Sequence, residues 1–94
     1  MIVLVVNYRV RPGTEELAKE YMCKMQQNTR KEPGCRFYVG HQSLQDPFQF
    51  CFYEQYDDQA ALDAHRAAPY FTEYVTNGLW TLTETRQAVL YEPV

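Results

Sequence analysis

The clearest pattern along the chain is an alternation of aromatic and polar residues near its middle. Phenylalanines recur at every second position from Phe48 to Phe52, with Gln49 and Cys51 between them, which is the period of a β-strand. Glu54 continues the alternation and is therefore expected on the same face as the phenylalanines. The pattern predicts a strand with an aromatic face that ends in a carboxylate.

A helical pattern follows this strand. Asp58 offers a side-chain oxygen to cap a helix, and Leu62 and His65 follow at helical spacing, which predicts a helix from Asp58 to Ala67. Pro69 breaks that helix, and a second helix is expected over residues 70–79. A carboxylate, an imidazole and phenols thus come from adjacent elements around one apolar region.

The remaining segments predict three further strands and one further helix. The strands are expected over Ile2–Val10, Cys35–Leu44 and Thr83–Tyr91. A cap at Thr14 begins the helix, and Pro33-Gly34 ends it. Its apolar stripe consists of Leu17, Ala18, Tyr21, Met22 and Met25.

The order of elements, β-α-β-β-α(α)-β, predicts the α+β class. A split βαβ repeat of this kind forms a four-stranded antiparallel sheet with its helices on one face. The other face is then uncovered, and Ile2–Val10 begins with apolar residues on both faces. The chain also has 8 Tyr and 5 Phe, more rings than a short monomer hides easily. We therefore expect a homodimer in which the two sheets pack against each other.

Length and charge limit the classes of protein to which the chain can belong. The 94 residues fit one domain, 1–94, and the formal net charge of −3 gives no electrostatic footprint for nucleic acid or an anionic membrane surface. No apolar run reaches transmembrane length, and the first residues read as a strand rather than a signal peptide. The 3 Cys show no close pairing. These features favour a cytoplasmic protein with reduced thiols and without a nucleic-acid or membrane partner.

Motifs for common cofactors are missing. The chain contains neither G-x-G-x-x-G nor G-x-x-x-x-G-K-[ST], and its cysteines and histidines lack the spacing of a zinc site. Ser43 has no base near it in the sequence, which argues against a serine hydrolase. We expect that no metal and no cofactor is needed.

The candidates for chemistry lie around the aromatic strand and the helices after it. His65 is the best general acid or base, because an unperturbed imidazole titrates near physiological pH; alternatively it is a helix-end histidine bonded to a carbonyl group. Glu54 either orients His65 or acts as the base itself if burial raises its pKa; alternatively it pairs with Arg9 or Arg66. The candidate substrate-binding residues are Asn7, Tyr38, Tyr70 and Tyr74. This composition suits a small pocket for an aromatic ligand.

Five segments, taken in their order and spacing, resemble the antibiotic biosynthesis monooxygenase (ABM) family. They are Arg11-Pro12-Gly13, Glu32-Pro33-Gly34-Cys35, Phe52-Tyr53-Glu54-Gln55-Tyr56, Leu62-Asp63-Ala64-His65 and Pro69-Tyr70-Phe71. The resemblance covers nearly the whole chain and implies a ferredoxin-like subunit in a tight dimer whose packed sheets form an α/β barrel. Family members commonly carry a histidine where this chain has Tyr70.

The resemblance implies an enzyme of one of two kinds. Quinol monooxygenases of the family oxidise phenolic rings with O2 and without metal or flavin, which requires a base and donors that hold an oxyanion. His65 or Glu54 is the implied base here, and Tyr70, Tyr74 and Asn7 are the implied oxygen-binding groups. LsrG-like members instead isomerise a small ketose phosphate in autoinducer-2 degradation.

Two further interpretations stay open. The haem-degrading branch of the fold uses an Asn on the first strand, which Asn7 matches, but it needs an iron-ligating His where residues 71–75 have none. The other is a non-catalytic dimer that binds a small molecule in the same pocket. The prediction we adopt is a cofactor-independent monooxygenase that acts on a phenolic or quinol-type aromatic small molecule.

Overall fold

Four antiparallel strands form one sheet in the computed structural model, which describes residues 1–94. The strands are β1 (Ile2–Val10), β2 (Cys35–Gln42), β3 (Gln49–Tyr56) and β4 (Thr83–Tyr91). Their order across the sheet is β2-β3-β1-β4, so β1 pairs with both β3 and β4. This is the predicted ferredoxin-like α+β fold.

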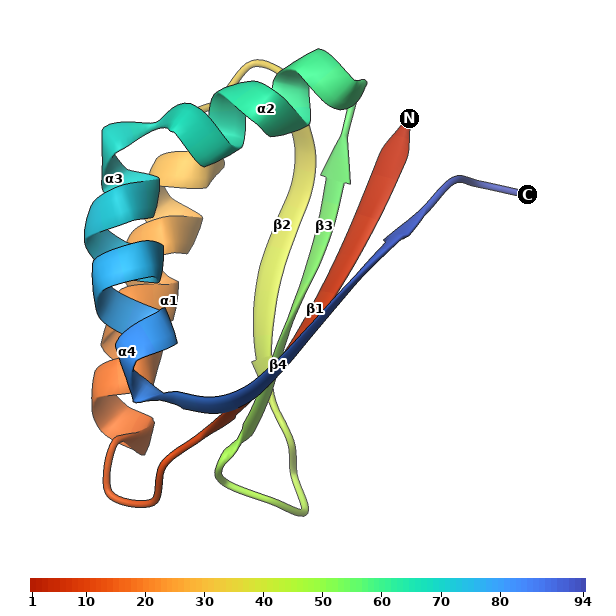
Figure 1. Cartoon of the computed structure of the whole chain (residues 1–94). Helices are drawn as coiled ribbons and strands as arrows, with labels where there is room; N and C mark the ends of the chain where they lie inside the picture. The colour runs from red at the N-terminus through yellow and green to blue at the C-terminus, as the bar shows by residue number, and fades with distance from the viewer.

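All the helices lie on one face of this sheet (Figure 1). They are α1 (Glu15–Thr29), α2 (Gln59–Ala67), α3 (Pro69–Phe71), the π-helix η1 (Thr72–Leu79) and α4 (Trp80–Leu82). A Cβ atom at Gly78 would lie 3.0 Å from the ring of Tyr21, so the absence of a side chain at Gly78 lets η1 pack closely on α1. None of these helices is both long enough and apolar enough to span a bilayer.

The second helical segment begins and breaks as the sequence predicts. The side chain of Asp58 accepts a hydrogen bond from the Ala61 backbone N–H at 2.9 Å and caps α2. Ala68 is extended, and Pro69 opens the next helix. That helix continues as η1 and α4 to Leu82, three residues beyond the predicted end.

The helix α1 begins after Thr14 as predicted, but the prediction that the Thr14 side chain caps it is wrong. Thr14 holds the N-cap position of α1, but its hydroxyl donates to the Arg11 carbonyl at 2.6 Å instead of accepting from the helix. The Glu15 carboxylate accepts from the Gly13 backbone N–H in the preceding turn. The turn, rather than a side-chain cap, therefore sets the start of α1.

The predicted end of the second strand is two residues too late. Strand β2 stops at Gln42, and the Ser43 hydroxyl oxygen accepts hydrogen bonds at 3.1 Å from the backbone N–H groups of Gln45 and Asp46. These bonds turn the chain and leave Leu44 fully exposed.

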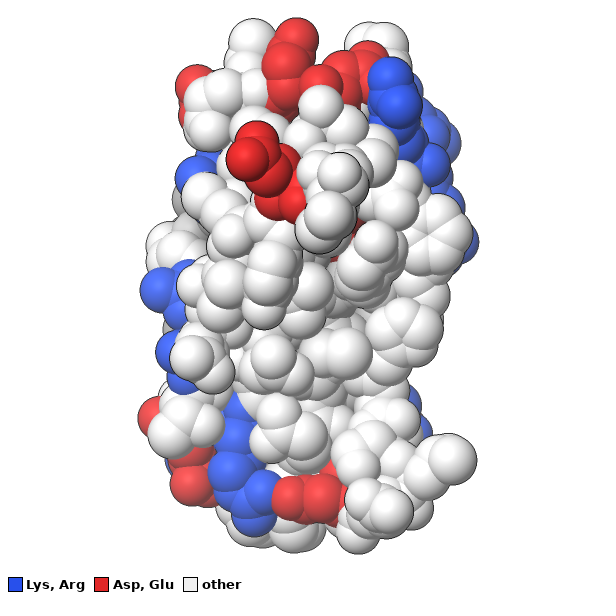
Figure 2. All heavy atoms as spheres, turned by 90° about the vertical axis from the view of Figure 1, so that its right-hand side faces the viewer, with Lys and Arg blue, Asp and Glu red and all other residues white.

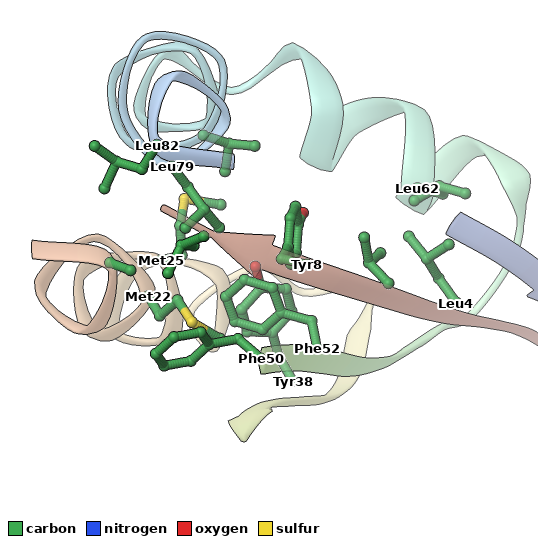
Figure 3. Packing of buried hydrophobic residues seen from close by; sticks show 14 of the residues in the cluster. Leu4, Tyr8, Met22, Met25, Tyr38, Phe50, Phe52, Leu62, Leu79 and Leu82 are labelled. Carbon is green, nitrogen blue, oxygen red and sulfur yellow. The ribbon is translucent and has the colours of Figure 1, made fainter. Parts of the chain in front are cut away.

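The hydrophobic core lies between the inner face of the sheet and the helices (Figure 3). Alternation along β3 buries Phe50, Phe52 and Glu54 together, as the sequence predicts. The predicted stripe of α1 is only partly right, because Ala18, Met22 and Met25 are buried, whereas Leu17 is 40 % exposed.

The outer face of the sheet carries no helix. Viewed from this side, uncharged side chains fill the centre of the face, and the charged ones lie toward its two ends and along its edges (Figure 2). Register places Val5 between Tyr53 on β3 and Val89 on β4, and Tyr53 lies beside Val39 on β2. An apolar band thus crosses all four strands on the side that the helices leave open.

Replacement of Met25 by alanine tests the position of the core. Met25 is fully buried, so Met25→Ala is expected to lower the free energy of unfolding by about 2–5 kcal/mol. Leu17→Ala in the same helix is the matched control, expected to cost roughly 1 kcal/mol or less. Urea denaturation measures both; equal losses would contradict the assignment of Leu17 to the helix surface.

Candidate functional site

A small cavity lies between the sheet and the second helical segment, with a volume of about 60 Å³. Residues of all four strands form its floor, and α2, α3, η1 and α4 line it from the helical side. Its twelve lining residues are Leu4, Val6, Tyr8, Tyr38, Glu54, His65, Arg66, Phe71, Val75, Trp80, Arg86 and Ala88. Both predicted catalytic residues, Glu54 and His65, are therefore in its wall.

Glu54 is a buried carboxyl group, with 3 % of its surface exposed. Burial, which disfavours the ionised form, raises its pKa from 4.5 to about 7, although the Tyr56 hydrogen bond and the charge of His65 oppose this rise. The Tyr56 hydroxyl donates to Glu54 Oε1 at 2.5 Å. Tyr56 lies two residues further along β3, so the strand itself places donor and acceptor on one face. Glu54 is thus held in place and titrates near neutral pH.

His65 is the second buried polar group, with 2 % of its surface exposed. It lies on the same side of α2 as the buried Leu62, three residues earlier. Its Nδ1 atom is 3.0 Å from Glu32 Oε2, and its Nε2 atom is 3.9 Å from Glu54 Oε1. In the neutral ring the proton on Nδ1 is donated to Glu32, which leaves the Nε2 lone pair on the side of Glu54.

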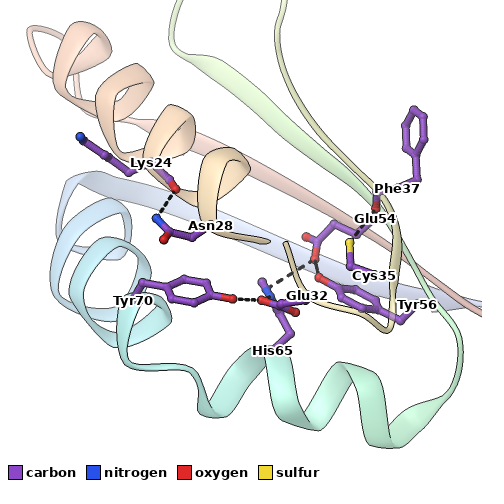
Figure 4. A network of polar contacts seen from close by, with 9 residues as sticks. All are labelled: Lys24, Asn28, Glu32, Cys35, Phe37, Glu54, Tyr56, His65 and Tyr70. Carbon is purple, nitrogen blue, oxygen red and sulfur yellow. Dashed lines mark hydrogen bonds and ion pairs between the residues drawn. The ribbon is translucent and has the colours of Figure 1, made fainter. Parts of the chain in front are cut away.

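Glu32 is a member of the polar network that the sequence did not reveal as a candidate site residue. It follows α1 in the turn before Pro33-Gly34, and its Oε2 atom accepts hydrogen bonds from both the His65 ring and the Tyr70 hydroxyl. Figure 4 shows the resulting polar network, Tyr70–Glu32–His65–Glu54–Tyr56. Because Glu32 is 33 residues from His65 in the chain, no periodicity in the sequence could join the two.

The four predicted substrate-binding residues have different positions. Tyr38 is buried in the cavity wall, with its ring centroid 5.6 Å from that of His65. The Tyr70 hydroxyl donates to Glu32 outside the cavity lining, and Tyr74 packs against Tyr21 with their ring centroids 6.5 Å apart. Tyr70 therefore acts on the cavity only through the network, and Tyr74 supports the packing of the helices.

Asn7 is not brought to the cavity at all. Its strand neighbours Val6 and Tyr8 line the cavity, so alternation turns Asn7 to the outer face, where it is exposed beside Cys51 and Gln87. The prediction that Asn7 shares a pocket with His65 within one subunit is therefore wrong. The physical reason is the period of two along β1.

Two arginines at the cavity were not predicted as site residues. Arg66 comes from α2 and Arg86 from β4, and both line the cavity while remaining exposed elsewhere along their side chains. Arg66 lowers the pKa of Glu54 by its charge without pairing with it, and Arg9 pairs with Asp46 instead. Neither alternative ion pair considered for Glu54 is formed. No group of three or more His, Cys, Asp or Glu is placed to hold a metal ion.

Fold and site together define a ferredoxin-like α+β domain with a buried acid–imidazole pair in a small aromatic cavity. A family model described as antibiotic biosynthesis monooxygenase matches residues 1–77. The chain therefore belongs to the antibiotic biosynthesis monooxygenase family.

Three individual proteins are also similar to this chain. A Synechocystis protein described as uncharacterized protein sll1783 is 31 % identical over 97 % of this chain and 62 % of its own length, so this chain spans less than two thirds of that relative. A crystal structure of an antibiotic biosynthesis monooxygenase has a TM-score of 0.94 and 27 % identity, with 100 % of this chain and 99 % of that chain covered. A Bacteroides thetaiotaomicron protein of unknown function, described as a possible oxidoreductase, has a TM-score of 0.89 and 27 % identity over 96 % of this chain and 94 % of its own.

The raised pKa of Glu54 predicts a specific pH dependence of stability. The folded state keeps the Glu54 proton up to about pH 7, whereas the unfolded chain loses it near 4.5, so stability falls as pH rises through this window. Glu54→Gln removes this loss, which amounts to roughly 3 kcal/mol at most. The measurement is the difference in unfolding free energy between wild type and variant from pH 4.5 to 8.

Glu73→Gln, at an exposed carboxylate on η1, is the control, and its difference from wild type should stay flat over the same range. A flat difference for Glu54→Gln as well would show that Glu54 is not the group whose proton is retained on folding.

Proposed function

We propose that this protein is a cofactor-independent monooxygenase that oxidises a phenolic or quinol-type aromatic small molecule with O2. The single observation that carries the proposal is the buried Glu54 beside His65 in an aromatic cavity, with the pKa of Glu54 raised to about 7. Membership of the family supports the general class of activity. The phenolic or quinol-type substrate is proposed in addition, because family membership does not specify it.

The geometry supplies what such chemistry needs from the protein. The Glu54 carboxylate, or His65 Nε2 on its cavity side, removes the phenolic proton. The phenolate then transfers an electron to O2, and the two radicals combine at a ring carbon to give a peroxide. Loss of that carbon's proton with cleavage of the O–O bond leaves a carbonyl group and water. One phenol and one O2 thus give one quinone and one water, so no external reductant is required.

The network around the base has a positioning role in this proposal. Glu32 fixes the ring of His65 through Nδ1, and Tyr56 fixes the carboxyl group of Glu54. A base whose orientation is fixed before the substrate binds loses less free energy when the transition state forms. Tyr38 and Phe71 contribute aromatic walls against which a substrate ring can stack.

A second candidate is an LsrG-like isomerase that acts on a small ketose phosphate. The observation that favours it is the pair of arginines at the cavity, Arg66 and Arg86, because guanidinium groups bind phosphate well. Glu54 and His65 would then move a proton between neighbouring carbons of the sugar. Assays on both substrate classes separate the two candidates.

We also propose that the protein works as a homodimer joined through the outer sheet faces. The apolar band around Val5 and Tyr53 supports this, together with the exposed rings of Phe37 and Tyr91 at 46 % and 54 %. A second copy of the chain would cover the band, and two packed four-stranded sheets would form a barrel.

Val5→Asp tests the dimer, because it places a charge in the middle of the apolar band. We expect wild type to sediment as a dimer at micromolar concentration and Val5→Asp to sediment as a folded monomer. Gln27→Asp, at an exposed position of α1, adds the same charge on the helical side and should leave the dimer intact. A wild-type protein that sediments as a monomer at every concentration would end this part of the proposal.

His65→Gln tests the function. We expect turnover of 1,4-naphthohydroquinone with O2 to fall by about 10²–10⁴-fold, with little change in melting temperature. His41→Gln is the control for loss of an imidazole. Because His41 is exposed on the outer face of β2, where the dimer is proposed to form, its turnover is compared with wild type only where sedimentation shows an intact dimer, and it should then be unchanged. Ribulose 5-phosphate is assayed in parallel for isomerisation.

Each result has a distinct meaning. Activity on the sugar alone would replace the monooxygenase by the isomerase. No turnover of either substrate would favour the binding dimer. A lower melting temperature of His65→Gln with unchanged turnover would show that His65 supports only the fold.

A further inference from the structure

The cavity is too small for its proposed substrate. Its volume is about 60 Å³, whereas an engineered cavity that binds benzene measures about 150 Å³. An aromatic ring can therefore reach Glu54 and His65 only if part of the cavity wall moves. The lining residues show which part of the wall can do so.

Trp80 and Arg86 separate the cavity from a hollow on the surface. The open hollow has a volume of about 230 Å³ and is lined by Trp80, Thr83, Glu84 and Arg86, two of which also line the cavity. The guanidinium carbon of Arg86 lies 3.8 Å from the centroid of the Trp80 ring, so the two shared residues are stacked. Joined together, the two spaces approach the lower limit of about 300 Å³ that is typical of ligand pockets.

Arg86 is the movable half of this pair. It lies on β4, which pairs with β1 alone, and its side chain is exposed. A cation stacked on a ring at an exposed site is held weakly, because water competes for the charge. Glu84 lies two residues earlier on the same face of β4 and lines the hollow, so its carboxylate can receive the guanidinium group when Arg86 leaves the ring.

Trp80 carries a polar group that is poorly satisfied within the protein. Its Nε1 atom is buried without a well-directed hydrogen bond. The Tyr8 hydroxyl in the same cavity wall is a candidate acceptor, since burial raises the pKa of Tyr8 to about 12 and Trp80 acts against that rise. Trp80 directly follows the π-helix η1 and packs edge-on against Phe71, with ring centroids 6.0 Å apart. π-helical turns are rare and occur frequently at functional sites. A donor in the wall of a cavity that lacks a well-directed partner is suited to an oxygen atom of a ligand.

We propose that the Trp80–Arg86 pair is the entrance of the site, and that the Trp80 Nε1–H group binds a ring oxygen of the substrate once Arg86 has moved aside. This inference rests on the proposed aromatic substrate and adds the requirement that its ring system carries a second oxygen atom. One oxygen faces Glu54 and His65 as the reacting phenol. The other accepts the hydrogen bond from Trp80.

Menadione, 2-methyl-1,4-naphthoquinone, is a suitable probe because it has two carbonyl acceptors and no phenolic proton to lose. The chain has only 1 Trp, so its fluorescence and its single indole N–H resonance both report on this entrance. We expect menadione to quench the fluorescence and to shift the indole proton downfield in the wild-type dimer. 2-Methylnaphthalene, which lacks the oxygens, is expected to bind without the downfield shift.

Two variants test the hydrogen bond from Trp80 and the entrance at Arg86 separately. Trp80→Phe keeps an aromatic ring but removes the donor, and it should weaken menadione binding about five- to tenfold by calorimetry while changing 2-methylnaphthalene binding less than twofold. Arg86→Met removes the charge but keeps a long side chain, and it should speed association of menadione in stopped-flow fluorescence. Arg36→Met, at an exposed arginine on the opposite edge strand β2, is the matched control.

Several results would overturn the inference. They are failure of wild type to bind menadione, a bound complex whose indole resonance has not moved, and equal menadione affinity of Trp80→Phe and wild type. An association rate that Arg86→Met leaves unchanged would show that Arg86 does not control entry to the site. Binding as expected without oxidation of 1,4-naphthohydroquinone would reject the proposed monooxygenase and leave this subsite standing, so the two failures can be told apart.

Discussion

The burial of the Glu54 carboxyl group is the constraint on which the site depends. A carboxylate that is 3 % exposed loses most of its hydration, and the neighbouring aromatic side chains cannot replace it. The fold compensates with the Tyr56 hydroxyl and with His65, yet the pKa of Glu54 still rises to about 7. Burial of Glu54 thus costs stability, and it leaves a carboxyl group that can gain and lose a proton near neutral pH.

The architecture explains how this costly group stays in place. Glu54 is on β3, an inner strand that is hydrogen-bonded on both sides, so its backbone cannot shift easily. His65 comes from α2, which Asp58 caps at one end and Pro69 ends at the other. Glu32 joins these elements from the end of α1, which lets one carboxylate orient the imidazole from the side away from the cavity.

Sequence periodicity predicted the parts of this site that depend on one element. The alternation through Glu54 and the helical spacing of Leu62 and His65 placed both catalytic candidates on buried faces, where they are found. Contacts between distant segments were not accessible in this way. Glu32 reaches His65 from 33 residues away, and nothing in the local pattern of Trp80 shows that its indole N–H is buried without a well-directed hydrogen bond.

The same limit explains the errors. Asn7 was grouped with the site because of its chemistry, although its strand turns it to the outer face of the sheet. The arginines at the cavity were overlooked because a net charge of −3 says nothing about where individual charges lie. Composition constrains the class of partner only when charges of one sign dominate a surface.

The most direct test of the account is the pH dependence of kcat/KM for oxidation of 1,4-naphthohydroquinone, corrected for the uncatalysed rate. If Glu54 is the base, the wild-type value should rise with an apparent pKa near 7 and then level off, whereas Glu54→Gln should be slow and lack this rise. The same profile and the same rate in both proteins would contradict a catalytic role for the buried carboxyl group.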